Sequence, residues 1–425
     1  RCRLATERAV TIVSVTPLPL GRDSRTLKQA MTLARLGFHS VVVADRRRWD
    51  LDPARPPEFP HDKPAMGRDA EPRPRRARSW IRFDGLPAVV QAPFFLYWLL
   101  RYFRRYVWQV FARLPRASLY CLHEFSSFPA VWMAARMARA PIVYDAHDFY
   151  SQMVEDSERT RFERRFIAPF QLWLERACIK RAAAVLTVSE GVGELMRKRF
   201  GVDPVVVRNC HDVRLDRPVS RGLRDRLGLR AGDFLLVAIG NAKQGYAADA
   251  AIEAVQRLPD HVHLAFVGDG YPGYAGRLRE KGLSSRVHLV GFLPPTEVVP
   301  TVRDADAAVI LYFARSADYR VALPNKLFQS IAAGVPILYP ELPQIASVLR
   351  AAGAGLCIDA QDPSSIARAV ERLLKDRDAA GTASVRRQLR SQWVWESEER
   401  LFSDEIRRCL RDTLPGLHAA QERAG

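Results

Sequence analysis

Short runs of hydrophobic residues alternate with amphipathic stretches along the first half of the chain. Val10–Val15 and Ser40–Ala44 are apolar runs of strand length, and residues 27–36 between them repeat apolar side chains at helical spacing. A strand, a helix and a strand in succession form a βαβ unit, and such units imply a parallel sheet. Further apolar runs lie at 119–122, 142–144 and 184–188, and three valines open the stretch 205–209. The first half therefore predicts one doubly wound, Rossmann-like domain.

The same alternation begins again after the middle of the chain. Further apolar runs lie at 234–239, 262–267, 287–290 and 307–312. This repetition predicts a second Rossmann-like domain and places the fold in the α/β class. We expect an N-terminal domain over 1–212, a C-terminal domain over 213–390 and a terminal helical segment over 391–425.

One stretch of the second half, Leu323–Pro336, combines a polar turn, a helix and the start of a strand. The helix is expected to end at Gly334, where a left-handed cap has no steric cost. Lys326 falls in its first turn, beside backbone N–H groups, and this arrangement suits a diphosphate. A capped helix with one lysine is also a common purely structural feature. Gly240 and Gly268 follow two of the strands and strengthen the prediction of a nucleotide site.

The first domain is interrupted by a basic insertion at 46–116, with 16 Lys/Arg against 7 Asp/Glu, half of the net charge of +18. Its first part, 46–78, is rich in proline, which excludes regular helix and predicts a long, irregular and mobile insertion. Such a basic stretch suits an anionic partner: phospholipid headgroups, a polyprenyl diphosphate or nucleic acid. Solubility explains the charge equally well. No recognition helix or glycine-spaced RNA motif accompanies the charge, so no nucleic-acid partner is expected.

Residues 94–111 place aromatic side chains beside Arg101, Arg104 and Arg105, which share one face if the stretch is helical. This pattern is typical of a helix at a membrane interface. A large helix packed between a sheet and a loop would show the same composition. Both interpretations are open at this stage.

The cysteines and the hydropathy of the chain indicate the cellular compartment in which the protein is expected. The chain has six cysteines without a Cys-x-x-Cys pair or metal-ligand spacing, which favours free thiols in a reducing compartment. No apolar run approaches the ~20 residues of a spanning helix, and no signal-peptide pattern is present. We expect a cytoplasmic protein, peripheral to the inner face of the plasma membrane if the basic stretch contacts lipid.

Two strands of the first domain are each followed by a histidine. His123-Glu124 follows the run at 119–122, and His147 follows the run at 142–144. Carboxyl ends of parallel strands meet at one edge of a sheet, where ligands bind. Asp23 and Arg25 open the first helix and are candidates for contact with a ligand at this edge. A helix cap and a solvated arginine are equally compatible with those two residues.

Several of these phrases together point to a known family. Pro324-Asn-Lys-Leu-Phe328, followed by Ala332-Ala-Gly-Val-Pro336, resembles the nucleotide-sugar-binding helix of retaining glycosyltransferases of family 4. Tyr144-Asp-Ala-His-Asp148 and Thr187-Val-Ser-Glu-Gly191 are similar to other phrases of that family. The resemblance covers nearly the whole chain in the right order. It implies the GT-B fold, in which two Rossmann-like domains face a central cleft and a tryptophan-led terminal helix crosses back to the first domain.

The resemblance also implies a reaction and a set of roles. A sugar would pass from a nucleoside diphosphate sugar to an acceptor that is polyprenyl-linked or is a polysaccharide or secondary-metabolite precursor. No cofactor is implied, and no metal, since an Asp-x-Asp pair in a donor loop is missing. His123 is implied as the catalytic residue. Donor binding is implied for Gly240, Lys243, Gly268, Asp318, Asn325, Lys326 and Gln329, and acceptor-side contact for Asp23, Arg25, Glu124 and His147.

The donor helix departs from the family pattern of two glutamates eight positions apart. Those positions hold Val321 and Gln329. Gln329 can still accept a ribose hydroxyl hydrogen through its amide oxygen, but without the strength of a carboxylate. Asp318 is the nearest substitute for the missing first glutamate. Two alternatives therefore stay open: a nucleotide-sugar epimerase of the same fold, and a degenerate GT-B scaffold without activity.

Overall fold

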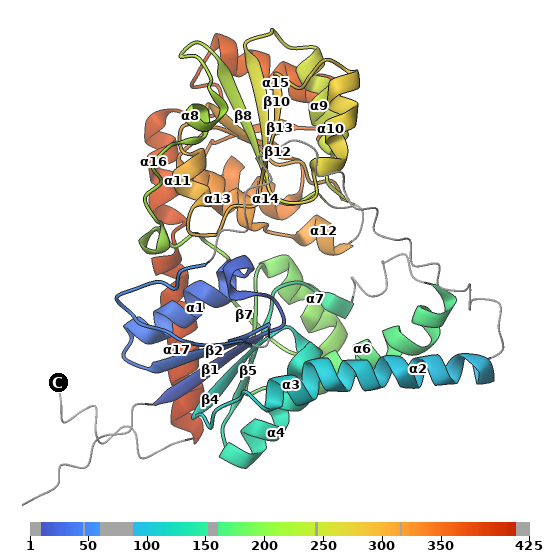
Figure 1. Cartoon of the computed structure of the whole chain (residues 1–425). Helices are drawn as coiled ribbons and strands as arrows, with labels where there is room; N and C mark the ends of the chain where they lie inside the picture. Colours follow the sequence, from blue (N-terminus) through green and yellow to red (C-terminus); the bar gives the residue numbers. More distant parts are fainter. Residues whose placement is uncertain are drawn as a thin grey trace, which may run out of the picture. The chain divides into compact units, whose positions relative to one another are not determined.

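The computed structural model describes residues 10–45, 47–59, 88–151, 160–242, 245–314 and 317–413 of the 425-residue chain. These residues form two compact units (Figure 1). Unit 1 takes its described residues from Arg1–Glu58, Trp80–Val207 and Glu398–Gly425, and those of unit 2 come almost entirely from Arg208–Ser397. Both units have an α/β architecture, which confirms the predicted fold class.

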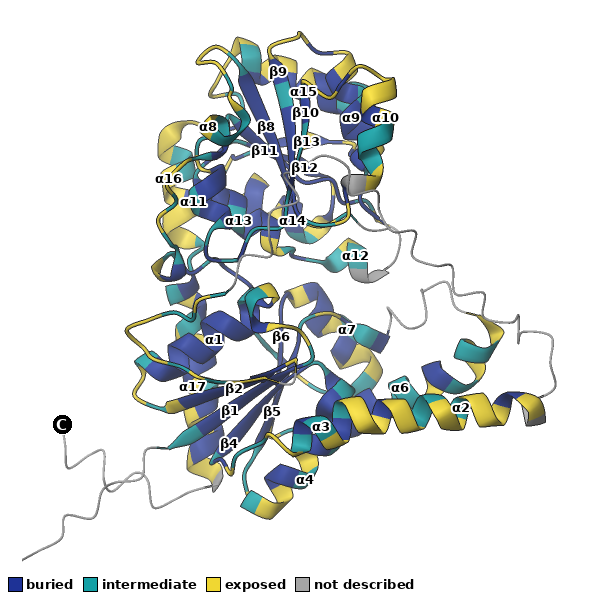
Figure 2. Cartoon of the chain, viewed as in Figure 1, coloured by how far each residue is buried: buried dark blue, intermediate teal, exposed yellow. Residues whose placement is uncertain are grey.

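Unit 1 contains a seven-stranded sheet in the order β3-β2-β1-β4-β5-β6-β7. All its neighbouring pairs are parallel except β2 with β3. The strand interiors are buried because helices cover the sheet (Figure 2). The strands are β1 (Thr11–Thr16), β2 (His39–Ala44), β3 (Arg47–Asp50), β4 (Leu119–His123), β5 (Ile142–Ala146), β6 (Ala184–Thr187) and β7 (Val205–Val206).

Strand β3 corrects the expectation of irregular structure from residue 46 onward. Arg47–Asp50 pairs antiparallel to β2, with Val42 opposite Trp49. The prolines of this stretch begin only at Pro53, so the four residues before it keep their N–H groups for an edge strand. Residues 60–87, most of the proline-rich part, lie outside the described residues.

The whole stretch from Ala88 to Phe111 in unit 1 is helical. This meets the condition under which Arg101, Arg104 and Arg105 are predicted to share one face. Among the described residues, no helix of either unit is both long and apolar enough to cross a membrane. The helices are α1 (Ser24–Arg35), α2 (Ala88–Tyr102), the π-helical η3 (Phe103–Trp108), α3 (Gln109–Phe111), α4 (Phe128–Ala138), the π-helical η5 (Glu163–Ile167), α6 (Ala168–Arg181) and α7 (Glu190–Phe200).

Unit 2 repeats the design with a six-stranded, all-parallel sheet in the order β10-β9-β8-β11-β12-β13. Its strands are β8 (Phe234–Ile239), β9 (Val262–Val267), β10 (Val287–Gly291), β11 (Ala307–Val309), β12 (Ile337–Pro340) and β13 (Leu356–Ile358). Its helices are α8 (Leu223–Leu227), α9 (Ala248–Gln256), α10 (Ala275–Glu280), α11 (Val298–Val302), α12 (Ala317–Val321), α13 (Asn325–Ala333), α14 (Pro343–Arg350), α15 (Pro363–Lys375) and α16 (Ala383–Gln392).

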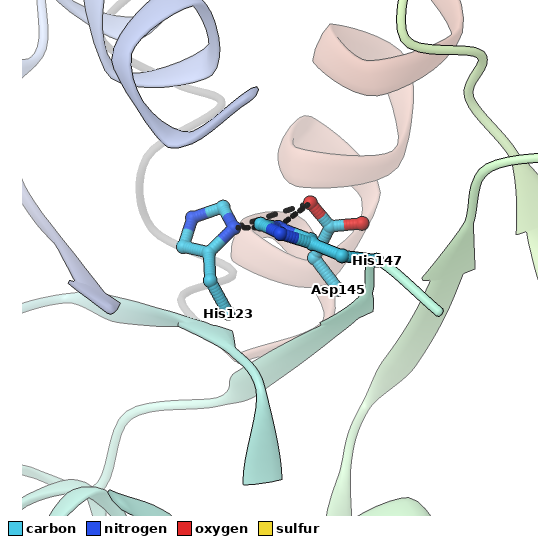
Figure 3. A group of neighbouring side chains, drawn as sticks. All are labelled: His123, Asp145 and His147. Carbon is cyan, nitrogen blue, oxygen red and sulfur yellow. Dashed lines mark hydrogen bonds and ion pairs between the residues drawn. The ribbon is translucent and has the colours of Figure 1, made fainter. Parts of the chain in front are cut away.

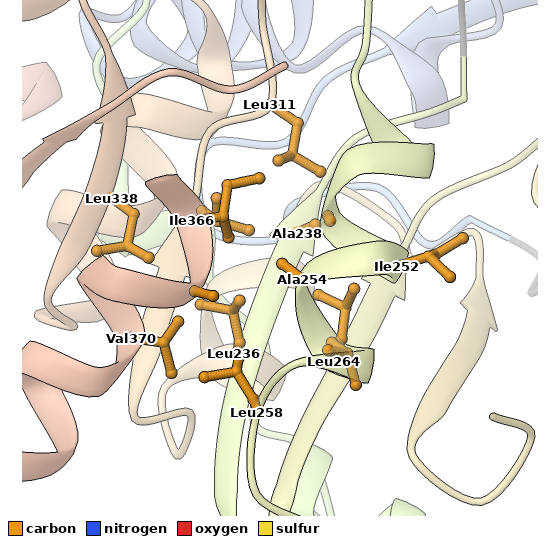
Figure 4. Packing of buried hydrophobic residues seen from close by; sticks show 14 of the residues in the cluster. Leu236, Ala238, Ile252, Ala254, Leu258, Leu264, Leu311, Leu338, Ile366 and Val370 are labelled. Atoms are coloured by element: carbon orange, nitrogen blue, oxygen red, sulfur yellow. The ribbon is translucent and has the colours of Figure 1, made fainter. Parts of the chain in front are cut away.

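The largest core of unit 2 lies between its sheet and the helices α9 and α15. Leu236 of β8, Leu264 of β9, and Ile366 and Val370 of α15 belong to this core (Figure 4). Each of these four side chains is fully or almost fully buried. Such burial contributes roughly 1.5–3 kcal/mol for each large aliphatic side chain. The core therefore fixes the strands whose carboxyl ends carry the loops of the candidate site.

The last helix, α17 (Trp395–Thr413), contributes to unit 1 from Glu398 onward. Phe402 and Ile406 are fully buried on one side of it. The hydroxyl of Thr32 in α1 donates to Glu399 at 2.6 Å. The terminal segment of the chain is thus integrated into the first unit by both apolar and polar contacts.

The packing of α1 leads to a stability prediction. Leu33→Ala removes a fully buried side chain and should lower the free energy of unfolding of unit 1 by about 2–5 kcal/mol. Leu36→Ala, three residues later and 37% exposed, is the matched control and should change it by less than about 0.5 kcal/mol. Denaturant titration, with amide hydrogen exchange in β1 and β2, measures both. Equal effects of the two variants would contradict the described packing of α1.

Candidate functional site

Two glycine loops follow β8 and β9 in unit 2 and pack directly against each other. A Cβ atom on Gly268 would lie 2.5 Å from the carbonyl oxygen of Gly240, so no other residue fits there. The backbone N–H of Ala242 donates to the carbonyl of Asp269 at 2.8 Å, and the side chain of Asn241 accepts from the N–H of Asp269 at 2.8 Å. The two loops therefore form one continuous backbone surface at the carboxyl edge of the sheet.

Lys326 extends from the first turn of α13 toward this surface. A Cβ atom on Gly240 would lie 2.6 Å from Nζ of Lys326 and 2.9 Å from its Cε, so the glycine leaves the space that the lysine occupies. Nζ also lies 4.2 Å from the ring centres of both Tyr246 and Tyr312, which meet edge to face. Cation–π contacts of this kind contribute roughly 0.5–2 kcal/mol. The lysine is therefore held in one place, beside the loops and the helix N-terminus.

Asn325 and Gln329 stand one turn apart on α13 and accompany the lysine. Asn325 is exposed, and its Oδ1 accepts a hydrogen bond from the amide of Asn209. Gln329 is half-buried. Pro324 precedes the helix and offers no side-chain cap to its first turn. The polar face of α13 thus carries an ammonium group and two amides within one helical turn.

Two of the predicted donor contacts cannot be placed. Lys243 lies outside the described residues. Asp318 belongs to the short helix α12, but its side chain is also outside them. Their donor roles stay predictions.

In unit 1, the side chains predicted from the strand ends meet around the carboxylate of Asp145 (Figure 3). Nδ1 of His123 lies 3.2 Å from Oδ2 of Asp145, and Nε2 of His147 lies 3.5 Å from the same oxygen. The two ring nitrogens are 3.1 Å apart. His123 ends β4, Asp145 lies on β5 and His147 follows that strand, so the parallel sheet brings the three together.

The guanidinium of Arg25 holds Asp145 from the other side. Its Nε and Nη2 donate to the two carboxylate oxygens at 2.8 and 2.7 Å, and its Nη1 donates to the carbonyl of Val207 at 2.6 Å. The amide of Gln29 donates to Oδ2 of Asp145 at 2.8 Å. Arg25 is 1% exposed, so the structure directs this side chain into unit 1. The ligand contact that the sequence predicted for Arg25 stays a prediction.

Asp23 is the helix cap that the sequence allowed. Its carboxylate accepts from the backbone N–H of Thr26 at 3.1 Å and from the hydroxyls of Thr16 and Thr26, both at 2.7 Å. It is buried and lies after β1, at the same sheet edge as the two histidines. These three hydrogen bonds fix the start of α1.

The electrostatics of the cluster follow from burial and from this charge arrangement. Burial opposes ionisation of Asp145, but the charge of Arg25 and hydrogen bonds from the two histidines hold its pKa well below the usual range. Burial likewise opposes the charge on Asp23, and His147 and His123 nevertheless lower its pKa. Burial lowers the pKa of His123, whereas for His147 the carboxylates of Asp23 and Asp145 overcome burial and raise the pKa. His147 is therefore the histidine that carries a proton more readily.

The same three side chains could in principle hold a metal, since their donor atoms lie within 4.8 Å of one another. The carboxylate of Asp145, however, already accepts from Arg25, Gln29 and His123. A divalent cation would have to displace those donors and lie beside the guanidinium charge, which is electrostatically unfavourable. The chemistry of this donor set fits a hydrogen-bonded charge network better than a metal site.

The two histidines differ in solvent exposure, and Glu124 differs from both in its backbone conformation. His123 is fully buried, and its Nε2 has no hydrogen-bond partner among the described residues. The side chain of His147 is 17% exposed. Glu124 has a φ of 73°, a region that L-residues rarely adopt, and its carboxylate accepts from the hydroxyl of Ser126. Such backbone strain costs about 1–3 kcal/mol and is concentrated at functional sites.

Two family models match the chain, one in each half. The description "Glycosyl transferase 4-like domain" covers residues 21–211, and "Glycosyl transferases group 1" covers residues 233–376. The two matches follow each other in this order and together span most of the sequence. The chain belongs to the family 4-type glycosyltransferases. Its two α/β units agree with the GT-B fold of this class, and the predicted resemblance is confirmed.

Individual proteins similar to this glycosyltransferase are distant in sequence. A D-inositol 3-phosphate glycosyltransferase of Thermomonospora curvata is 26% identical over 63% of this chain and 67% of that protein. A sucrose-phosphate synthase from Thermosynechococcus elongatus is similar in structure, with a TM-score of 0.63, 16% identity and coverage of 94% of this chain and 98% of that one. The Anabaena protein Alr3699/HepE, solved in complex with UDP-glucose, has a TM-score of 0.60, 15% identity and coverage of 94% and 99%. The two structures share the fold with this glycosyltransferase.

Sequence reasoning did not assign roles to several residues of this glycosyltransferase that the structure places at the two sites. Tyr246 and Tyr312 flank Lys326, and Gln29 and Asp145 organise the histidines. The sequence did contain a signal for Asp145, because it is a carboxylate at a strand end, two residues before His147. The tyrosines had a weaker signal: each follows a strand of unit 2 by a few residues, and aromatic residues at such positions usually belong to the core.

The charge network predicts a shift in the titration of one histidine. Asp23→Asn should lower the pKa of His147, because Asp23 is the leading charge that raises it. Since the folded pKa lies above the unfolded value, this contact stabilises the fold below about pH 6.5, and the stabilisation is lost as pH rises through the folded pKa. Histidine-ring NMR titration measures the shift. Asp50→Asn, an exposed carboxylate on β3, is the control and should leave His147 unchanged, and an unchanged His147 in Asp23→Asn would refute the assignment.

Proposed function

We propose that this glycosyltransferase transfers a sugar from a nucleoside diphosphate sugar to an acceptor hydroxyl with retention of anomeric configuration and without a metal ion. The single observation that carries the proposal is the placement of Lys326. Its Nζ occupies the space that Gly240 leaves open, beside the paired glycine loops and in the first turn of α13. Backbone amides, a helix N-terminus and a lysine are together suited to a diphosphate.

Cleavage of the donor moves negative charge onto the leaving diphosphate, so groups that stabilise this charge accelerate the reaction. In our proposal Lys326 and the amides of α13 perform this role. Asn325 and Gln329 lie on the same helix, and the amide oxygen of Gln329 accepts from a ribose hydroxyl. Gly240 and Gly268 allow the two loops and the end of Lys326 to pack together beside the helix N-terminus. The solved complex of the structural neighbour Alr3699/HepE with UDP-glucose supports a nucleotide sugar as donor.

The metal-independent assignment rests on the cations that the chain itself supplies. Lys326 provides the charge that a bound dication provides in other sites. The histidine cluster of unit 1 is already organised by Arg25, which disfavours a metal there. His147 and His123 are assigned to the acceptor and sugar side, where the more exposed His147 has the better access to solvent. We assign the acceptor to the class of lipid-linked saccharides, met at an anionic membrane surface, because of the basic excess in 46–116.

A transfer assay separates the proposal from its rivals. The full chain is incubated with a panel of nucleotide sugars and a lipid extract, in the presence of a chelator, and products are analysed by NMR. We expect release of a nucleoside diphosphate and a product with the anomeric configuration of the donor. Release of an epimerised sugar without transfer would favour an epimerase, and no turnover of any donor would favour a scaffold, which the substitutions at Val321 and Gln329 motivate.

Lys326 provides a direct binding prediction. Lys326→Met should weaken binding of the nucleoside diphosphate by about 1.5–3 kcal/mol, the range of a charge-assisted hydrogen bond, and should leave binding of the nucleoside unchanged. Lys281→Met, an exposed lysine that follows α10, is the matched control. Calorimetry with each ligand measures the difference. An equal loss for nucleoside and diphosphate would show that Lys326 does not contact the diphosphate.

A further inference from the structure

The outward face of α2 and η3 is apolar although it is exposed. Leu96, Leu100 and Phe103 follow one another at helical spacing, and they are 56%, 62% and 51% exposed. Trp108, five residues after Phe103 within the π-helical turn, is 62% exposed. Figure 2 shows this long helix with exposed residues along much of its length. A solvent-facing helix side is normally polar, so this face differs from an ordinary surface.

The opposite side of the same helix accounts for its folding. Phe95 stacks on Phe166 of η5 with ring centres 5.3 Å apart. Trp98 and Tyr102 meet Phe170 of α6 edge to face, at 5.6 and 5.1 Å. These contacts join α2 to η5 and α6 through a continuous row of aromatic rings. The outward residues are therefore not needed to hold the helix in place.

Basic side chains are interspersed with the exposed apolar ones. Arg101, Arg104 and Arg105 are all exposed, and none of them forms an ion pair with a carboxylate of the described residues. The sequence from Ala88 to Arg116 contains no Asp or Glu. The outward face thus combines large apolar groups with positive charges and carries no negative charge.

The same chemistry continues on the neighbouring helices α6 and α4. Trp173 of α6 is 62% exposed, and Arg176 and Lys180 follow it at helical spacing. An open groove of about 750 Å³ lies between the ends of α6 and α4. The ring of Trp132 in this groove lies 5.8 Å from the guanidinium carbons of both Arg136 and Arg181. Among the described residues, no acidic side chain lines the groove, and its remaining cations are Arg139 and Lys180.

We propose that this surface, defined by the exposed faces of α2, η3 and α6 and by the groove, docks the chain on an anionic lipid bilayer. Leu96, Leu100 and Phe103 enter the acyl boundary, and the arginines contact headgroup phosphates. Docking would give the protein access to a lipid-linked acceptor, and in this respect the proposal rests on the proposed function.

Two other occupants fit the surface less well. A second copy of the chain would bring clusters of like charge together, which is unfavourable in a desolvated contact. A nucleic acid would pair with the arginines and stack on the aromatic rings, but it has no aliphatic surface that would bury Leu96 and Leu100. A bilayer satisfies the apolar and the basic side chains at once. Each basic side chain at an anionic surface contributes about five-fold in binding, and salt screens this beyond roughly 8 Å.

The test measures cosedimentation of the full chain with vesicles of phosphatidylcholine, with or without phosphatidylglycerol. One variant combines Arg101→Gln, Arg104→Gln and Arg105→Gln, and a second combines Leu96→Ser, Leu100→Ser and Phe103→Ser. A control on α17 combines Arg400→Gln, Leu401→Ser and Arg407→Gln, which are exposed positions of the same kinds. Circular dichroism verifies that each variant is folded.

We expect the parent and the α17 control to bind the anionic vesicles, with binding that falls steeply as salt is added, and to bind the neutral vesicles weakly. The arginine variant should lose about 100-fold, and the apolar variant at least about ten-fold. A parent that does not bind anionic vesicles would overturn the proposal. An apolar variant that binds like the parent would also overturn it, because the arginines alone would then serve a polyanion.

Nucleotide binding is measured on the same samples by calorimetry. Unchanged nucleotide affinity with lost vesicle binding supports a docking surface separate from the donor site. Vesicle binding by a parent that binds no nucleotide would leave the docking surface supported while the proposed transfer fails, so the two failures are distinguishable.

Discussion

The account of the donor site depends on one steric constraint, the absence of a side chain at Gly268. A Cβ atom there would collide with the backbone of Gly240, whereas one at Gly240 would displace the flexible end of Lys326. Two glycines thus allow the loops after β8 and β9 to meet and the lysine of α13 to lie against them. Tyr246 and Tyr312 complete the enclosure, each ring centre 4.2 Å from Nζ. Sheet, loops and helix together therefore hold one cation at the carboxyl edge of the sheet, beside the N-terminus of α13.

Unit 1 is organised by a different interaction, the buried ion pair between Arg25 and Asp145. The bidentate contact fixes one carboxylate at the edge of the sheet, and both histidines orient toward it. Removal of one partner of such a pair costs about 3–5 kcal/mol, since the other charge stays buried. Burial lowers the pKa of His123, whereas the carboxylates of Asp23 and Asp145 raise that of His147. Asp145 thus contributes both to the stability of the unit and to the protonation of its candidate site.

Much of the fold could be predicted because its strands are continuous apolar runs and its helices have clear periodicity. The edge strand Arg47–Asp50 could not, since it is polar and its pairing with β2 depends on a neighbour rather than on its own pattern. For the site, strand ends located His123 and His147, and the helix start located Lys326. The inward direction of Arg25 and the tyrosine pair at Lys326 arise from tertiary packing, which a spacing argument does not contain. The exposure of Leu96 and Leu100 likewise depends on which side of α2 packs against η5 and α6, and the sequence pattern does not contain that information.

The central claim is that Lys326 and the glycine loops bind a nucleoside diphosphate without a metal. Calorimetry of the full chain with UDP, GDP and TDP, each with and without a chelator, tests it most directly. The account predicts that at least one of the three binds, that chelation leaves its affinity unchanged, and that the corresponding nucleoside binds at least about ten-fold more weakly. Binding that disappears on chelation, or equal affinity for the nucleoside and its diphosphate, would contradict the account.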